Sequence, residues 1–437
     1  MPSYPDTFYA RTVATRRERP ALRGSVEVET CIVGGGLAAL TCAYELARAG
    51  RSVAVLEAQA VGWGASGRNG GFVGPGYSRS YASIAGALGE DKARALHRLS
   101  IEGMQIVADS IRDLGVADSV KPLPGKIAAV RYDSGDRLQR TAERLARDFD
   151  YGVEFWPREQ VREVLRSPSY HQALFDPQSF HIHPLNYARA LADAIEALGG
   201  QVFEDARVVS ADLSGAQKRL STAGGVVTAK NVVIACGGYT DGLVPKLRAS
   251  HLPIATYVLT TEVAPDALAQ VIGTRAAISD DRRAGDYYRL VEDGQRLLWG
   301  GRITTRTSEP RDLAALLRRT MIATYPQLAG LKVEMAWSGL MSYARHLMPQ
   351  IGEIVPGVWH CMGFGGHGLN TTAIGGRVVA EGILEASDRH TLFEPFGLVW
   401  NGGPFGRVAV QATYWRYQLA DWWRERQTSK GQAASRF

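Results

Sequence analysis

A glycine-rich turn between two apolar runs is the feature that most limits the folds open to this chain. It lies within CIVGGGLAALTCAYELARAGRSVAVLEA, residues 31–58. The run Thr30–Val33 predicts a short buried strand, and the alanine-rich segment Leu37–Ala49 predicts a helix that ends at Gly50. Ser52–Leu56 predicts a second strand. A strand, a glycine turn, a helix and a second strand form a βαβ unit of an α/β domain.

The turn itself predicts a phosphate-bearing ligand. It reads Gly-Gly-Gly-Leu-Ala-Ala, which meets the pattern G-x-G-x-x-G/A with alanine at the third small position. The first glycine of the pattern permits the tight turn, and the second glycine of the pattern lets the backbone approach a pyrophosphate at the helix N-terminus. The acidic residue that ends the second strand can accept hydrogen bonds from an adenosine ribose, and no arginine follows it to bind a 2′-phosphate. An ADP-containing cofactor is therefore predicted, with an ordinary βαβ unit as the alternative. The candidate residues are Gly34, Gly36, Leu37, Ala38, Glu57 and Ala58.

The segment Gly62–Gly76 is a loop in which seven of the fifteen residues are glycine. Such a loop lets the backbone come close to a ligand, and a flexible surface loop is the alternative. An NAD-binding domain usually continues directly with further βα units, so this loop favours FAD. The candidate cofactor-binding residues here are Ala65, Ser66, Arg68, Asn69, Gly70 and Gly71.

Two later segments carry further glycine turns. The strand-like run Val226–Thr240 ends in a glycine pair, of which Gly237 is a candidate cofactor contact. In Trp359–Ile383 a strand runs into a second glycine turn, and a helix follows it. This second helix N-terminus would suit the pyrimidine end of an isoalloxazine ring, where it stabilises negative charge. The candidates in this turn are Gly365, Gly366, His367, Gly368 and Leu369.

With these motifs the chain resembles the D-amino acid oxidase superfamily of FAD-dependent oxidoreductases, and within it the gamma-glutamylputrescine oxidase-like group. The matching stretches are VGGGLAALTCAYELARAGRSVAVLEA, GWGASGRNGGF, ACGGYT, WSGLMSYARHLMPQIGE and GFGGHGLNTT. They extend from near the N-terminus to about residue 383, and the string GASGRNGG discriminates best.

The resemblance implies an α/β fold in which an FAD-binding Rossmann-like domain is interleaved with an antiparallel-sheet substrate domain. We expect residues 1–85, 176–245 and 338–385 to form the FAD-binding domain, residues 86–175 and 246–337 the substrate or cap domain, and residues 386–437 a C-terminal extension. In the family, the position of Val208 lies against the adenine. The chain pattern also predicts a long amphipathic helix over Glu90–Leu114 and a hairpin that turns at Asp293-Gly294.

The reaction that the resemblance implies is FAD-dependent oxidation of an amine or amino acid, by hydride transfer to the flavin, to an imine that water hydrolyses. Dioxygen is a possible second substrate, and oxidase and dehydrogenase activity stay open. Our catalytic candidates are Trp337, Tyr288 and His346; Tyr287, Arg302, Tyr343, Arg345 and His367 are further lining candidates. The two adjacent tyrosines have a structural alternative as one exposed and one core aromatic of a strand. Arg302, Arg345 and His346 could bind a carboxylate or form surface pairs.

The cysteine positions predict a noncovalently bound FAD. Relatives similar to monomeric sarcosine oxidase carry a flavin-linked cysteine in the segment that corresponds to Ser338–Ser342, which reads SGLMS here. The four cysteines lie in apolar segments without C-x-x-C spacing, so we expect reduced core residues. The nine histidines show no metal-binding spacing, and no metal site is expected.

Composition indicates a globular protein with no nucleic-acid partner. The 437 residues carry a net charge of +6, and the Lys and Arg residues are scattered among acidic ones. We expect a cytoplasmic protein, because no signal peptide or membrane span is evident. The alternative function is that of a non-oxidase flavoprotein, such as a dehydrogenase or an FAD-dependent tRNA-modifying protein. The sequence lacks a cluster of Lys and Arg residues, which argues against the tRNA-modifying protein.

The C-terminal segment Tyr414–Gln427 interleaves aromatic residues with arginine, which predicts an amphipathic helix. Docking on the protein's own surface is our expectation. Membrane contact and a subunit interface are the alternatives, and the sequence leaves the oligomeric state open.

Overall fold

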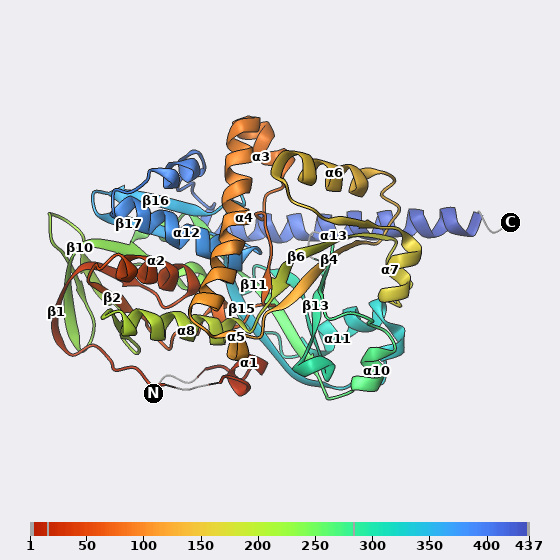
Figure 1. The fold of residues 1–437 in the computed structure, drawn as a ribbon, viewed down its shortest axis with the longest axis horizontal. Coiled ribbons are helices and arrows are strands. Elements are labelled where there is room, and N and C mark those ends of the chain that lie inside the picture. The colour runs from red at the N-terminus through yellow and green to blue at the C-terminus, as the bar shows by residue number, and fades with distance from the viewer. Residues whose placement is uncertain (1–3, 15–16, 283–284, 435–437) are drawn as a thin grey trace. The chain divides into compact units, whose positions relative to one another are not determined.

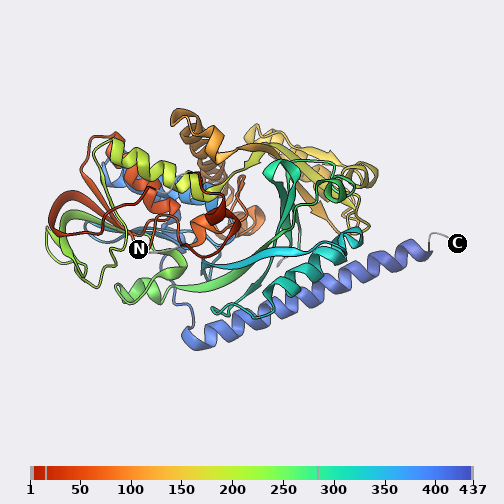
Figure 2. The same cartoon turned by 90° about the horizontal axis from the view of Figure 1, so that it is seen from below.

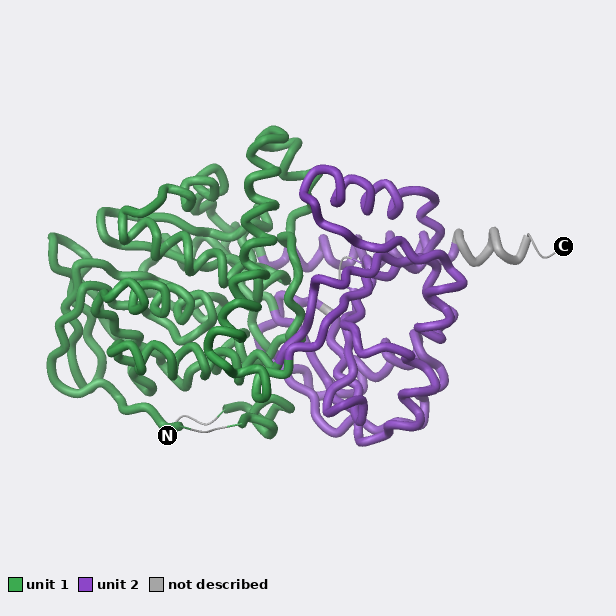
Figure 3. The backbone as a smooth tube through the Cα atoms, in the orientation of Figure 1, with its two compact units in different colours: residues 1–121, 183–254, 339–406 green, residues 122–182, 255–338, 407–437 purple. Residues whose placement is uncertain are grey.

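The computed structural model describes residues 4–14, 17–282 and 285–434, without the side chains of Arg302 and of residues 427–434. The chain divides into two compact units (Figure 3). The first comprises Met1–Lys121, His183–Ile254 and Gly339–Gly406, and the second comprises Pro122–Ile182, Ala255–Ser338 and Arg407–Phe437.

The first unit holds a mostly parallel sheet and the helices that pack on it (Figure 1). Its strands are β1 (Gly24–Val33), β2 (Val53–Leu56), β3 (Phe72–Val73), β7 (Gln201–Phe203), β8 (Ser210–Asp212), β9 (Lys218–Ser221), β10 (Gly225–Ile234), β16 (Gln350–Val355) and β17 (Val358–Met362). Its helices are α1 (Phe8–Arg11), α2 (Leu37–Arg48), α3 (Tyr81–Leu88), α4 (Glu90–Asp113), α5 (Ala117–Val120), α8 (Pro184–Ala197), α9 (Pro245–Arg248) and α12 (Gly368–Ile383), with 3₁₀ turns at Ala65–Gly67, Gly237–Tyr239 and Arg389–Phe396.

The sheet of the first unit runs in the order β16-β17-β10-β1-β2-β7. Adjacent strands from β17 to β7 in this order are parallel, and β16 is antiparallel to β17. Strand β9 pairs antiparallel with β10, and β8 pairs antiparallel with β9. Strand β1 is longer than its apolar run predicts. Its polar half, from Gly24, pairs in register with β10 from Gly225, and this pairing holds it extended.

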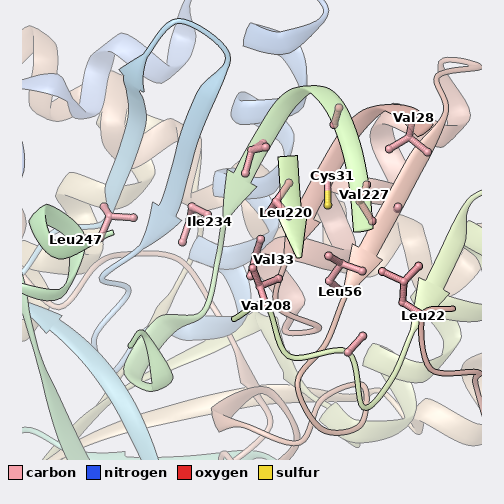
Figure 4. Packing of buried hydrophobic residues seen from close by; sticks show 14 of the residues in the cluster. Leu22, Val28, Cys31, Val33, Leu56, Val208, Leu220, Val227, Ile234 and Leu247 are labelled. Atoms are coloured by element: carbon pink, nitrogen blue, oxygen red, sulfur yellow. The ribbon is translucent and has the colours of Figure 1, made fainter. Parts of the chain in front are cut away.

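The core of this unit follows from strand alternation. Cys31 and Val33 point to one face of β1, where they pack with Leu56, Val208 and Ile234 in one apolar cluster (Figure 4). On the helical side, α2 packs against α12 and α8, and α4 packs against α12. A Cβ at Gly103 of α4 would lie 2.2 Å from a backbone oxygen of α12, so only glycine permits this approach.

The second unit holds a mostly antiparallel sheet (Figure 2). Its strands are β4 (Leu123–Val130), β5 (Glu154–Trp156), β6 (Gln172–His181), β12 (Ala277–Asp280), β13 (Tyr287–Val291) and β14 (Arg296–Thr304), with β11 (His251–Thr261) and β15 (Val333–Ala344) continuing into the first unit. Its helices are α6 (Arg137–Phe149), α7 (Arg158–Val164), α10 (Pro265–Ala269) and α11 (Leu313–Thr324); α13 (Gly403–Ala434) begins in the first unit and continues in the second. The strands named for this unit follow the order β15-β11-β14-β13-β12-β4-β6, with β5 on β6, and the β12–β4 pair is parallel.

These elements confirm the predicted fold class and the hairpin between β13 and β14. The compact units divide the chain differently from the expected domains at several points. Residues 246–254, expected with the substrate domain, lie in the first unit, and residues 176–182, expected with the FAD-binding domain, lie in the second. The expected C-terminal extension is divided between the two units after residue 406. The long helix α4, expected with the substrate domain, lies in the first unit because it packs on α12. The assignment of cofactor and substrate binding to particular domain boundaries stays a proposal.

Candidate active site

Three glycine turns meet at one edge of the parallel sheet. They follow β1, β10 and β17, which are adjacent and parallel, with Val33 opposite Ile234 and Ile234 opposite His360. The carboxyl ends of parallel strands lie at the same sheet edge, which is where doubly wound α/β folds bind their ligands. Residues far apart in the sequence are thereby brought together.

The first turn is tightly enclosed by its neighbours. Gly34 has a φ of +113°, and a Cβ there would lie 2.9 Å from the carbonyl oxygen of Ala235. Gly36 is the N-cap of α2 and has an extended backbone. A Cβ at Gly36 would lie 3.1 Å from Ser66 Oγ, which accepts a hydrogen bond from the Leu37 N–H at 3.0 Å. The predicted Ser66 thus positions the N-terminus of α2.

Glu57 lies beside this turn. Its carboxylate accepts hydrogen bonds from the Gly35 N–H at 2.5 Å and from the Gln59 N–H at 2.8 Å. Burial raises the pKa of Glu57, and these two backbone donors act in the opposite direction. A carboxylate has about four acceptor positions, so Glu57 keeps acceptor capacity for a ligand hydroxyl.

The predicted loop Gly62–Gly76 is ordered by its own side chains. Asn69 Nδ2 donates to the carbonyl oxygens of Ala65 and Ser66, both at 3.0 Å, and Asn69 Oδ1 accepts from the Gly71 N–H at 2.7 Å. Arg68 Nε donates to the Trp63 carbonyl oxygen at 2.7 Å, and its guanidinium lies 4.1 Å from the centroid of the Trp63 ring. The expected alternative of a flexible loop does not fit this bonding.

The third turn, before α12, contacts residues that sequence reasoning missed. The Gly366 N–H donates to Ser78 Oγ at 2.9 Å, and the Gly365 N–H donates to the Ser342 carbonyl oxygen at 2.9 Å. Asn370 Nδ2 donates to the Gly76 carbonyl oxygen at 3.1 Å, which ties α12 to the end of the glycine loop. Ser78 has no local motif around it, so only the tertiary contact identifies it.

Tyr343 stands against the same turn. A Cβ at Gly365 would lie 3.0 Å from its ring, and a Cβ at Gly366 would lie 2.9 Å from its hydroxyl oxygen. Burial raises the pKa of Tyr343 to about 12. The phenol therefore stays protonated throughout the neutral and mildly alkaline range.

Comparison with known proteins identifies the family. The model of the family described as "DAO: FAD dependent oxidoreductase" matches residues 29–382. This chain belongs to that family. It is an FAD-dependent oxidoreductase of the DAO family, and the expected resemblance is confirmed.

The sequence matches to two named relatives cover nearly the whole chain. Gamma-glutamylputrescine oxidoreductase of Escherichia coli is 33% identical over 90% of this chain and 92% of its own length. A probable oxidoreductase OrdL of Haemophilus influenzae is 31% identical over 93% of this chain and 94% of its own. The solved structure of glycine oxidase from Geobacillus kaustophilus superimposes with a TM-score of 0.70 at 21% identity, covering 85% of this chain and 98% of that one. This likeness supports the fold.

The cofactor that the DAO family implies is FAD, and the residues at the sheet edge fit it. Among the described residues, no atom lies within 4 Å of a Cβ placed at Gly237 or Gly368, so the backbone there faces open space. Gly368 is the first residue of α12, and Gly36 caps α2, so two helix N-termini are available for anionic groups. Val208 is buried in the same core cluster as Val33 and Ile234. Ala58 is half-buried, and Leu369 is buried.

The catalytic candidates take different positions. Tyr288 is fully buried in the second unit, stacked on Trp299 at 4.3 Å between ring centroids, and its hydroxyl lies 2.9 Å from those of Tyr170 and Tyr325. Trp337 is buried on β15, also in the second unit. The Tyr288 environment matches the structural alternative, and a role for either residue at the reacting centre stays a prediction.

His346 lies in the first unit and uses both ring nitrogens. Its Nδ1 accepts from the Met348 N–H at 3.2 Å, and its Nε2 lies 3.2 Å from the Gly397 carbonyl oxygen. Burial lowers its pKa, so the ring is neutral near pH 7. Tyr287 is half-buried, Arg345 is exposed, and the side chain of Arg302 lies outside the described part of the structure.

The cysteines are free, as expected. Cys31, Cys42 and Cys361 are buried, and Cys236 is half-buried. Burial raises all four pKa values, that of Cys236 to about 12. In the described ranges no group of three or more His, Cys, Asp or Glu residues could hold a metal ion. No helix within them combines the length and apolar character needed to span a membrane.

Proposed function

We propose that this chain oxidises the amine of gamma-glutamylputrescine, or of another polyamine derivative, with FAD held noncovalently. The observation that carries the proposal is its 33% identity, over nearly the full length of both chains, with a protein named gamma-glutamylputrescine oxidoreductase. The glycine turns at one sheet edge support the cofactor part of the proposal.

We assign the cofactor contacts by chemistry. The α2 N-terminus, with Gly36, Leu37 and Ala38, would hold the diphosphate. Glu57 would accept ribose hydroxyls, and Val208 would lie against the adenine. The turn Gly365–Leu369 at the α12 N-terminus would hold the pyrimidine end of the flavin, where the helix dipole favours negative charge.

FAD, when bound, supplies a hydride acceptor for the carbon that bears the amine. The protein's part is to orient that carbon, exclude water and keep the substrate nitrogen unprotonated. Tyr343, whose pKa is raised to about 12 by burial, can donate a hydrogen bond beside the third turn without losing its proton. Noncovalent attachment is supported by the raised thiol pKa values, because a neutral thiol is a poor nucleophile.

The test uses the purified protein without oxygen. Gamma-glutamylputrescine, free polyamines, N-methyl amino acids, D-amino acids and 2-hydroxy acids are added separately, and the visible flavin band is followed. We expect a polyamine derivative to bleach it fastest, with a rate that rises with pH until the amine is neutral, because a protonated nitrogen has no lone pair to assist hydride departure. Recovery of colour in air would identify an oxidase. Bleaching by a hydroxy acid and by no amine would contradict the proposal.

A further inference from the structure

Helix α13 carries large apolar side chains that the described residues leave open to solvent. They are Phe405, Val408, Trp415, Leu419, Trp422 and Trp423, and all but Trp423 belong to one narrow stripe. Their exposed fractions lie between 48% and 82%, and they make up half of the large exposed apolar residues in the described part of the chain. An apolar surface of this kind marks an interaction site.

The stripe has the spacing of a helix–helix seam. Phe405, Val408, Ala412, Trp415, Leu419 and Trp422 follow one another at intervals of three, four, three, four and three residues. All six are exposed. This alternation places them at the a and d positions of a heptad repeat, which keeps one narrow stripe facing a partner helix.

The opposite side of α13 is where the helix docks on the second unit. Gln411 Oε1 accepts a hydrogen bond from Thr304 Oγ1 at 3.0 Å, and Arg424 lies 6.0 Å from the ring centroid of Tyr132. Glu425 lies 4.0 Å from Arg131. The residues of Gly403–Arg426 that are half-buried fall at the b, c, f and g positions, away from the seam. The predicted docking of this helix thus accounts for one face and leaves the seam unexplained.

The exposed area is sufficient for a dimer. If a fully exposed aromatic side chain offers about 200 Å², the three aromatic residues of the seam, Phe405, Trp415 and Trp422, offer on the order of 400 Å² per chain. The exposed side chains of Val408, Ala412 and Leu419 add to this area. Two such faces would together remove on the order of 1,000 Å² from water, which is the lower bound for a specific interface.

Side-chain sizes favour a second copy of the same helix in antiparallel orientation. A two-fold axis midway between Thr413 and Tyr414 places each a residue opposite a d residue of the other copy. The small Ala412 then faces the large Trp415, Val408 faces Leu419, and Phe405 faces Trp422, each pair occurring twice. Such a contact is isologous and closed, as in most homodimers.

We propose that the seam of α13 is a homodimerisation surface that pairs with the seam of a second copy in antiparallel orientation. A lipid surface is the competing occupant. A membrane-surface helix ordinarily presents a wider apolar face. The large exposed apolar side chains of α13, apart from Trp423, are confined to the narrow a/d stripe, and the small Ala412 falls opposite the large Trp415, so both observations favour a second chain.

The association test uses the full-length flavoprotein at micromolar concentration, with mass measured by light scattering after size exclusion. Trp415→Glu and Leu419→Glu place a charge in the seam, and Ala420→Glu places the same charge on the same helix outside it. We expect a dimer for the unsubstituted protein and for Ala420→Glu. For each seam variant we expect the dissociation constant to rise more than about thirtyfold, as for an interface hot spot.

Folding of each variant is checked by flavin absorbance and melting temperature, and two seam variants are used so that one misfolded protein does not decide the result. A monomeric unsubstituted protein, or seam variants that stay dimeric, would overturn the proposal. Flotation of the unsubstituted protein with phosphatidylcholine–phosphatidylglycerol vesicles, without dimerisation, would assign the seam to a membrane.

The orientation is tested by distances between spin labels on Ala409→Cys and, separately, Arg426→Cys. At 1.5 Å rise per residue, the antiparallel axis predicts separations along the helix of about 14 Å for the first label and about 38 Å for the second. The unsubstituted chain, treated in the same way, gives the background from the native cysteines. Short distances at both sites would refute the antiparallel pairing.

Discussion

Replacing Gly36 by valine tests whether the turn after β1 is the cofactor site. The backbone of Gly36 is extended, with φ −85° and ψ 171°, so a β-branched residue can adopt it. The new Cβ would lie 3.1 Å from Ser66 Oγ, and the two methyl groups must either displace Ser66 or project in front of the α2 N-terminus. The second position is where we place the diphosphate.

These contacts set the expected loss of folding free energy in Gly36→Val. Losing the hydrogen bond from the Leu37 N–H to Ser66 costs about 0.5–1.5 kcal/mol. Overpacking at one tight contact costs about 1–3 kcal/mol. For a large domain each kcal/mol lowers the melting temperature by about 2–4 °C. The apoprotein should therefore still fold, with a melting temperature lower by several degrees.

The assay compares thermal unfolding with and without added FAD, together with the flavin-to-protein absorbance ratio after purification. FAD at one hundred times its dissociation constant should stabilise the unsubstituted apoprotein by about 2.7 kcal/mol. We expect Gly36→Val to lose this gain and to purify colourless. The matched control is Gly86→Val in α3, where the glycine is exposed and no described atom lies within 4 Å of the new Cβ.

Gly36→Val protein that purifies fully yellow, or that keeps the stabilisation by FAD, would refute the assignment. Loss of flavin from the Gly86→Val control as well would show that the effect is general destabilisation. Either result would remove the argument that connects the glycine turn to the diphosphate.

Four further predictions follow from the same contacts. Glu57→Gln should weaken FAD binding less than Gly36→Val in a fluorescence titration, because the amide oxygen still accepts one ribose hydrogen bond; equal losses would contradict this. Acid precipitation should release yellow FAD into the supernatant, whereas colour held in the pellet would show a covalent bond. Tyr343→Phe should slow anaerobic flavin bleaching by the best amine while FAD stays bound, and the same change at the half-buried Tyr132 should not; an unchanged rate would exclude a role for the Tyr343 hydroxyl. Burial and the adjacent Arg289 lower the pKa of His181 to about 3, so the folded state stays unprotonated where the unfolded chain, with an ordinary histidine pKa near 6.5, binds a proton. The free energy of unfolding should therefore fall as pH drops below about 6.5, by at most about 1.4 kcal/mol per pH unit from this group, and His181→Gln should flatten the slope in urea unfolding; identical slopes would be evidence against it.

The glycine turns were predictable because their causes are local. A turn with φ at +113°, as at Gly34, excludes most side chains, and a helix that starts directly after glycine needs only a few neighbouring residues to be recognised. The long helix α4 and the hairpin between β13 and β14 follow in the same way from periodicity and turn chemistry. The family resemblance then connected these local signals to FAD.

The sequence by itself thus determined the fold class and the positions of the glycine turns, and its family resemblance pointed to FAD. Only the tertiary structure decided which strands are neighbours, because the pairing of Val33 with Ile234 and of Ile234 with His360 joins residues roughly one hundred to two hundred positions apart. The contact of Ser78 with Gly366 and the hydroxyl partners of Tyr288 depend on that arrangement. The apolar spacing of α13 is visible in the sequence, but which face stays exposed depends on how the helix docks, since burial is a property of the packed molecule and not of the local chain.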